Sequence, residues 1–308
     1  MDAELDTLAT ALYVRTDDLL KASPQHARWR PMVGFAPLIT DAELITLAVM
    51  QVLLQFRSET RWLRHAHAHL RHLFPYLPQQ PGYNKRLRAL APTLEWLITA
   101  LACDTSLWTD DVWVVDSTPV ECGRSRETAH RSDLAGIAEY GYCASHSRYF
   151  WGLRLHLIAT LHGLPVGFAL TGAKADEREA LLSILTTDCP ATRAWGQAGH
   201  EQILIGDKNY YGRMFETQLD ESHTDLLRPA RQGEHARPGA RFFQPLRQTI
   251  ESIFDTFKDQ LNLEGHGGHT LTGVAVRVYQ RILALTAAIW HNDHCGLAIK
   301  RSLIAYDH

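Results

Sequence analysis

The sequence predicts an α/β fold in which a mixed sheet, with helices on both faces, follows an all-helical N-terminal region. In the first hundred or so residues, apolar side chains recur with helical spacing. From residue 111 onward, short runs of apolar and β-branched residues take over, as is typical of buried strands. The expected order there, β-β-β-α-β-α-β-α, matches a mixed sheet flanked by helices. We therefore expect two domains, residues 1–105 and 106–308.

The composition is that of an ordinary globular protein. Of 308 residues, 45% are hydrophobic and 21% are charged, which argues against disorder. No apolar run approaches the roughly 18 residues of a membrane span, and the acidic start MDAELD does not resemble a signal peptide. We therefore expect a cytoplasmic protein. The five cysteines contain no C-x2-C pair, which indicates neither a disulfide framework nor a zinc ribbon.

Helices are predicted along the whole N-terminal domain. Thr40 and Glu43 form a T-x-x-E capping box, and Ser58 is placed to cap the next helix. Residues 74–84 are rich in proline and glycine and are expected to form a loop, after which Pro92 should bend the last helix. The expected helices cover residues 2–21, 41–56, 58–72 and 85–104.

Strands are predicted to begin at residue 112. A hairpin turn at residues 162–164 separates two of them, while residues 121–148 lack periodicity and are expected to form a loop. Amphipathic stretches then alternate with short apolar runs. The expected strands cover residues 112–115, 149–161, 165–171, a run ending at 207, and 225–227. The expected helices cover residues 176–187, 214–220, 242–263 and 273–291.

Basic residues are concentrated locally, although the net charge is only −3 and the pI is near 6.6. A balanced total can hide a basic face that neutralises phosphates. Short helices with clustered arginines suit a helix-turn-helix-like DNA-binding region, and a plain helical subdomain is the alternative. The first cluster contains Arg57, Arg61, Arg64, Arg71, Lys85, Arg86 and Arg88. The second contains Arg228, Arg231, Arg237 and Arg241.

Two aspartates stand at the ends of predicted strands. Asp116 follows the apolar run in DVWVVDSTPV, and Asp207 follows the run in QILIGDKNYY. Strands buried on both faces leave polar residues only at their ends. A single aspartate there is usually a turn or capping residue. Two of them, followed by a glutamate on a helix, indicate a shared site instead.

That glutamate is Glu251, on an amphipathic helix predicted over residues 242–263. At about 100° per residue, Arg247, Glu251 and Lys258 project together from its polar face. The pattern alone is equally consistent with a ladder of surface ion pairs, each contributing a few tenths of a kcal/mol.

Three carboxylates from separate elements can hold two divalent metal ions. Mg²⁺ prefers oxygen ligands and retains water, and a pair of ions can clamp the attacking and leaving oxygens of a phosphodiester. We expect Asp116, Asp207 and Glu251 to be both the metal ligands and the catalytic residues. We expect two Mg²⁺ ions, with Mn²⁺ as a substitute.

The chain resembles bacterial insertion-sequence transposases of the DDE type, most closely the insertion-sequence 982 group. The resemblance runs from about residue 39 to about residue 292. It rests on DSTP at 116–119, YGYCA at 140–144, GLRLH at 152–156, GDKNY at 206–210, and the R-x3-E-x6-K spacing from 247 to 258. It implies an RNase H-like fold in which the three acids bind the metals that cut and join DNA.

The chain departs from the group at two positions. Asn209 stands where glycine is usual; asparagine tolerates a left-handed backbone, so we expect the turn to survive. Gln244 stands where related transposases often carry tyrosine, which puts a tyrosine contact to DNA in doubt.

The sequence therefore predicts a DDE transposase that cuts the ends of an insertion sequence and transfers them to target DNA. Lys208, Arg247 and Lys258 are expected to contact phosphate or steady Glu251. The expected partners are the element's inverted repeats, the target DNA, and a second copy of the chain. An RNase H-like nuclease without strand transfer and a catalytically dead DNA-binding derivative are the alternatives.

Overall fold

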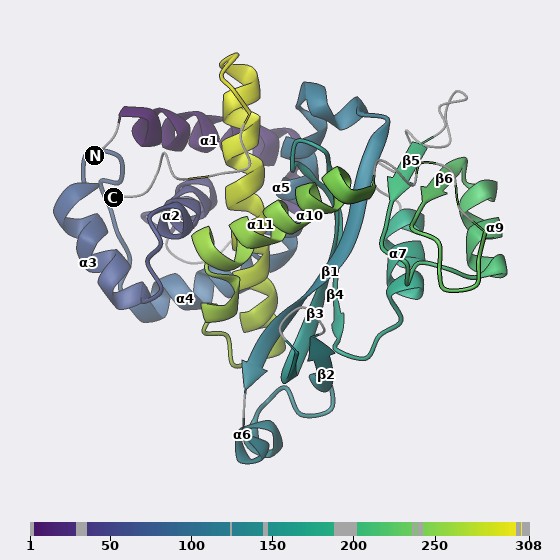
Figure 1. Cartoon of the computed structure of the whole chain (residues 1–308). Coiled ribbons are helices and arrows are strands. Elements are labelled where there is room, and N and C mark those ends of the chain that lie inside the picture. Colours follow the sequence, from purple (N-terminus) through teal and green to yellow (C-terminus); the bar gives the residue numbers. More distant parts are fainter. Residues whose placement is uncertain are drawn as a thin grey trace. The chain divides into compact units, whose positions relative to one another are not determined.

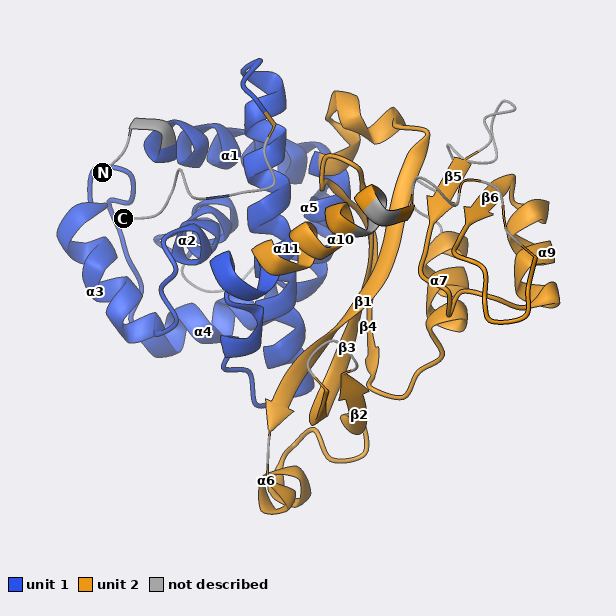
Figure 2. Cartoon of the chain, viewed as in Figure 1, with its two compact units in different colours: residues 1–101, 257–298, 302–308 blue, residues 102–256, 299–301 orange. Residues whose placement is uncertain are grey.

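A computed structural model describes residues 3–28, 36–123, 125–143, 147–187, 202–235, 237, 239, 243–299 and 303. The chain divides into two compact units (Figure 2). Unit 1 comprises Met1–Leu101, Phe257–Ala298 and Ser302–His308, and unit 2 comprises Ala102–Thr256 and Ile299–Arg301. Unit 1 is thus assembled from both ends of the sequence.

Unit 1 is helical. Its principal helices are α1 (Ala3–Ala22), α2 (Asp41–Leu53), α3 (Glu59–His69), α4 (Gln80–Ala89), α5 (Ala91–Cys103) and α11 (Leu271–His294). The predicted capping box is confirmed, because the Glu43 N–H donates to Thr40 Oγ1 and the Thr40 N–H donates to the Glu43 carboxylate. Helix α11 is buried along most of its length and packs against α1, α2 and α4. Within the described residues, no helix combines the length and apolarity needed to cross a membrane.

Two predictions about these helices are wrong. Residues 80–84, expected in a loop, form the start of α4, where Pro81 occupies the first turn. Proline is tolerated there because the first turn does not use its N–H. The single bent helix expected over residues 85–104 is two helices, α4 and α5. Pro92 cannot donate to the carbonyl of Arg88 and its ring crowds that carbonyl, so a new helix begins.

Unit 2 is built on a six-stranded mixed sheet with the order β2-β3-β1-β5-β6, in which β4 also pairs with β3 (Figure 1). The β1–β5 and β5–β6 pairs are parallel, and the other pairs are antiparallel. This arrangement confirms the predicted RNase H-like α/β fold. The strands are β1 (Val112–Gly123), β2 (Glu139–Cys143), β3 (Arg148–Thr160), β4 (Pro165–Gly172), β5 (Gln202–Ile205) and β6 (Thr224–Leu227).

The loop expected over residues 121–148 is more ordered than predicted. It contains the end of β1, the short helix α6 (Arg126–Arg131) and β2. Strand β2 was missed because Tyr140 and Tyr142 point to solvent, so the segment EYGYC lacks an apolar alternation.

Three longer helices pack on the sheet of unit 2. They are α7 (Glu177–Thr186) against β3 and β4, α9 (Arg213–Glu221) against β6, and α10 (Phe243–Asp255) against β1. Gly167 of β4 allows α7 to approach closely, since a Cβ atom there would lie 2.6 Å from Ile184 Cγ2. Helix α7 therefore covers the sheet face that carries Gly167.

Candidate active site

Asp116 lies in the middle of β1, and the prediction that it ends a strand is wrong. Strand β1 continues to Gly123 because it pairs with β3, with Asp116 opposite Leu157. On its other side, β1 pairs with β5 only from Val112 to Val114. Asp116 therefore stands just beyond the carboxyl end of the parallel β1–β5 pair. In open α/β sheets, ligand sites gather at such ends.

Asp207 occupies the equivalent place beyond β5. Val114 pairs with Ile205, and each aspartate follows its partner of that pair by two residues. The two aspartates therefore leave the same end of the parallel pair, and the charge of Asp207 acts on Asp116. Gly206 shapes the turn between β5 and Asp207, because a Cβ there would lie 2.8 Å from the ring of the buried Tyr210.

Asn209 holds the Asp207 carboxylate. Its backbone N–H donates to Asp207 Oδ1 at 2.6 Å, and its Nδ2 donates to Oδ2 at 3.0 Å. The turn survives as expected, since the Tyr210 N–H donates to Asp207 O at 3.3 Å, but it does so without a positive φ at Asn209. Asparagine serves here through an Asx-type turn that fixes the orientation of Asp207.

The pKa of the Asp116 carboxyl group is well above its ordinary value. Its pKa is raised to about 7, chiefly by burial, although the hydrogen bond from the Ser117 N–H lowers it. The charges of Glu177 and Asp207 raise the pKa further, and Arg154 opposes them. Three carboxylates thus act in one region against a single arginine. Carboxylate oxygens are the ligand type that Mg²⁺ and Mn²⁺ prefer, and the charge of such an ion would favour the ionised form of these groups.

Glu177, Ser117 and Arg154 form a hydrogen-bonded cluster that the sequence analysis missed. Ser117 Oγ donates to Glu177 Oε1 at 2.6 Å, and Arg154 Nη1 donates to the same oxygen at 2.8 Å. The β1–β3 register explains the cluster, because Arg154 pairs with Pro119 and His156 with Ser117 on one sheet face. The available signal was the pair of polar residues, Arg154 and His156, at alternate positions of an apolar strand.

Glu251 is exposed on α10, the helix that packs against β1. Among the described residues, no three His, Cys, Asp or Glu side chains are gathered so that they could hold a metal ion. The structure therefore brings Asp116 and Asp207 together but does not draw Glu251 into the same ligand group.

The structure places the three predicted supporting residues, Lys208, Arg247 and Lys258, in different surroundings. Lys208 is exposed and directly follows Asp207. Lys258 lies in η4 (Thr256–Gln260), a π-helical turn, where the spacing of an α-helix no longer applies. The role expected for Lys258 stays a prediction. The side chain of Arg247 lies outside the described residues.

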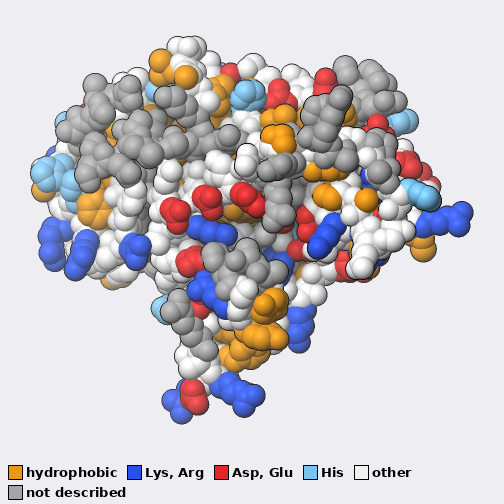
Figure 3. All heavy atoms as spheres, in the orientation of Figure 1, with side chains coloured by type: hydrophobic (Ala, Val, Ile, Leu, Met, Phe, Trp, Pro, Cys, Tyr) orange, Lys and Arg blue, Asp and Glu red, His pale blue; other side chains and the backbone are white. Residues whose placement is uncertain are grey.

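The predicted DNA-binding residues fall into two groups. Figure 3 shows Lys and Arg side chains over the region of α3 and α4. Arg86 instead pairs with Asp41 at 2.7 Å, and buried Arg228 pairs with Glu216 and Glu234. The predicted DNA-binding residues of unit 1 that are exposed are Arg57, Arg61, Arg64, Arg71, Lys85 and Arg88.

In the second basic cluster, Arg228 and Arg237 are both ion-paired with glutamates. Arg237 pairs with Glu216 at 3.1 Å. Arg231 is exposed and its guanidinium lies 3.6 Å from the centre of the Tyr211 ring. Arg241 lies outside the described residues.

The mixed sheet, with one aspartate just beyond each strand of its parallel pair, defines an RNase H-like protein. Residues 107–287 match the family model of the transposase DDE domain, which is more than half of the 308 residues. The chain therefore belongs to this family and is a DDE transposase of the insertion-sequence type. Transposases act on DNA, and DDE domains generally use divalent metal ions. No curated protein matches the chain.

Proposed function

We propose that this transposase cuts DNA at the ends of an insertion sequence and joins the freed ends to target DNA. Within the family, the resemblance described above favours the insertion-sequence 982 group. The observation that carries the proposal is that Asp116 and Asp207 both follow the carboxyl end of the β1–β5 pair and interact electrostatically. Glu251 is proposed as the third carboxylate, supplied by the helix that packs on β1.

The chain's own residues would prepare this site for two divalent ions, Mg²⁺ or Mn²⁺. When bound, such ions stabilise the charge on the attacking and leaving oxygens of a phosphodiester. Asn209 orients Asp207 through two hydrogen bonds. Arg154 and Ser117 engage Glu177 and so hold a further carboxylate near Asp116. No side chain is needed as a general base.

DNA holding is assigned to the helical region of residues 1–105. The exposed cations of α3, α4 and their flanks, above all Arg61, Arg64 and Lys85, would neutralise backbone phosphates. We leave Arg86 and Arg228 out of this surface because carboxylates already neutralise them. A dimer on the DNA would bring two such regions to the two ends of the element.

Conservative replacement of the three acids tests the proposal. Asp116→Asn, Asp207→Asn and Glu251→Gln should each reduce cleavage of a labelled end duplex by about a hundredfold to a thousandfold, as removing a charge-stabilising group typically does. Binding in a gel shift should remain. Asp255→Asn is the matched control, since this acid is exposed on the same helix as Glu251.

Near-normal cutting by any of the three variants would remove that residue from the site. A joining assay with precut ends separates the transposase from a nuclease without strand transfer. Cleavage without any joined product would favour the nuclease.

A further inference from the structure

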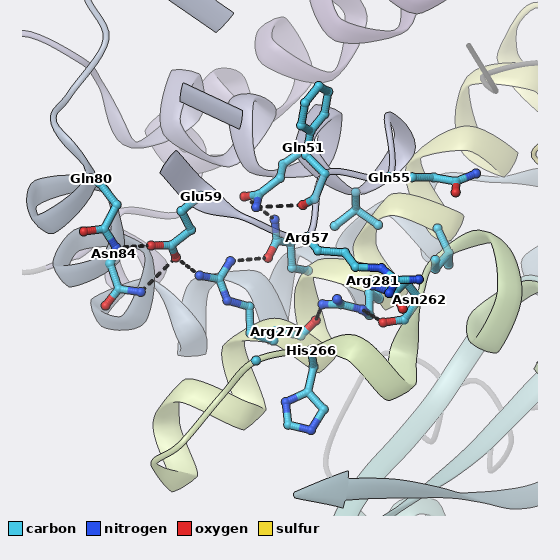
Figure 4. A pocket seen from close by; sticks show the side chains of 15 residues that line it. Gln51, Gln55, Arg57, Glu59, Gln80, Asn84, Asn262, His266, Arg277 and Arg281 are labelled. Atoms are coloured by element: carbon cyan, nitrogen blue, oxygen red, sulfur yellow. Dashed lines mark hydrogen bonds and ion pairs between the residues drawn. The ribbon is translucent and has the colours of Figure 1, made fainter. Parts of the chain in front are cut away.

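Unit 1 contains a polar pocket of about 230 Å³ (Figure 4). The connection between α2 and α3 forms one wall, α4 adds another, and the segment after η4 and helix α11 complete it. Most of the lining side chains are amides or charged groups. The pocket therefore suits a small polar ligand better than an apolar one.

Positive charge predominates in this pocket. Arg57, Arg277 and Arg281 line it, and Glu59 is its only acid among the described residues. Glu59 is already fully engaged, because its carboxylate pairs with Arg277 and accepts hydrogen bonds from Gln80 and Asn84. One carboxylate therefore serves one arginine, and two guanidinium groups remain without an acid in the lining.

Of these two arginines, Arg281 gives the stronger evidence for a bound anion. It is only 6% exposed, and within the described chain it donates to two neutral carbonyls, Asn262 O at 3.2 Å and Arg277 O at 2.8 Å. Burial, together with the charge of Arg277, lowers the pKa of Arg281 to about 9. Buried charges in proteins are ordinarily paired, so an anion is the missing partner.

Asn262 offers an independent sign of a ligand. Its Nδ2 is buried and has no hydrogen-bond partner among the described residues. Its backbone is left-handed, with φ of 50°, as is that of Gln55 across the pocket, with φ of 56°. Strained non-glycine residues cluster at ligand sites. A buried donor is ordinarily hydrogen-bonded, so a donor without a protein partner indicates an acceptor on a ligand.

We propose that this pocket binds a phosphate group. Arg281 would supply the buried charge, Arg57 would approach from the exposed rim, and Asn262 Nδ2 would donate to a further oxygen. A tetrahedral phosphate presents several acceptor oxygens to such a set, and arginine binds it in a bidentate manner. The phosphate belongs either to the DNA backbone, an origin that rests on the proposed function, or to a free anion.

Inorganic phosphate is the first probe, with thermal unfolding and ³¹P NMR line broadening as readouts. Phosphate should stabilise the full chain and the control Arg126→Gln, which changes an exposed arginine of α6. Arg281→Gln and Asn262→Asp should lose at least about tenfold in phosphate affinity, the latter by placing a carboxylate beside Arg281. Arg281→Gln should also unfold no earlier than the unmodified chain in phosphate-free buffer, because it removes a buried unpaired charge.

Equal phosphate affinity in Arg281→Gln and the unmodified chain, or no binding by the unmodified chain, would overturn the site. If Arg281→Gln does not fold, Arg57→Gln decides the matter, since this exposed residue can be changed without disturbing the core. Unchanged phosphate affinity in Arg57→Gln would then count against the proposal.

A second experiment, which measures DNA binding, identifies the origin of the phosphate. All proteins in it carry Asp116→Asn, so the result does not depend on cleavage. If the site takes a backbone phosphate, Arg281→Gln, which changes a buried residue outside the exposed basic surface, should weaken binding of an end duplex and reduce the log–log salt slope by about one unit. If phosphate affinity falls while DNA binding and its salt slope stay unchanged, the ligand is a free anion.

Discussion

The two units of the protein hold opposite surpluses of charge. Unit 2 sets Asp116, Asp207 and Glu177 against one arginine, Arg154. Unit 1 lines its pocket with three arginines against one glutamate, Glu59. By contrast, Arg228 is buried between two glutamates, Glu216 and Glu234, which balance its charge.

This contrast distinguishes buried charges that are neutralised within the protein from buried charges that a bound ligand would neutralise. A buried ion pair that is complete satisfies its own partners, whereas an incomplete set raises the free energy of the empty protein. Functional sites commonly carry such a cost in stability. The two surpluses are the basis of the proposed cation site and the proposed phosphate site, and stability measurements can separate the two kinds of charge.

Arg154→Leu should have the largest effect on stability. It removes the charged partner of Glu177 and leaves that carboxylate beside Asp116, so we expect a loss of about 3 kcal/mol in the free energy of unfolding. Urea unfolding measures it. The double variant Arg154→Leu with Glu177→Gln should recover much of the loss. Equal losses in the single and double variants would show that packing, and not charge, decides the effect.

His156 should give the next largest effect, and it depends on pH. The side chain is buried, its Nε2 lies 2.9 Å from Thr171 Oγ1, and burial lowers its pKa to about 4. The unfolded chain takes up a proton below about pH 6.5, whereas the folded chain does not, so this stability is lost as pH falls from 6.5 toward 4. Between pH 8 and pH 5, His156→Gln should lose about 2 kcal/mol less than the unmodified protein. Parallel curves for the two proteins would contradict the buried neutral imidazole.

Asp116→Asn should have a smaller effect of opposite sign. In EDTA at pH 8, removing a charge that burial and two neighbouring carboxylates disfavour should stabilise the protein by about 1 kcal/mol. Thermal unfolding without and with Mg²⁺ measures this. Mg²⁺ should stabilise the unmodified protein but not the variant. A destabilised variant in EDTA would indicate that Asp116 serves the fold.

The fold could be predicted from the sequence where periodicity and capping are local. The capping box at Thr40 and the helical period of residues 273–291 are contained in short windows, and both are found. The extension of β1 past Asp116 could not be predicted, because it depends on pairing with β3, some forty residues away. The interruption at Pro92 was placed correctly, although the structure has two helices there instead of one bent helix.

The candidate site was predictable only in part, for the same reason. Asp116 and Asp207 end apolar runs, and that local pattern located them. Glu177 begins a helix and resembles any first-turn acid, and only the register of β3 brings Arg154 to it. The pocket of unit 1 is lined by residues of α2 and α11 that are more than 200 positions apart in the sequence. No local sequence pattern could therefore identify Arg281.

The central claim is that Asp116 and Asp207 form a divalent-ion site for cutting DNA. Its most direct test is the cleavage of a labelled element end by metal-stripped protein to which single ions are returned. Mg²⁺ or Mn²⁺ should restore cutting, whereas Ca²⁺, which takes 6–8 ligands at about 2.3–2.6 Å, should allow DNA binding without cutting. Cleavage that persists in EDTA would contradict the claim.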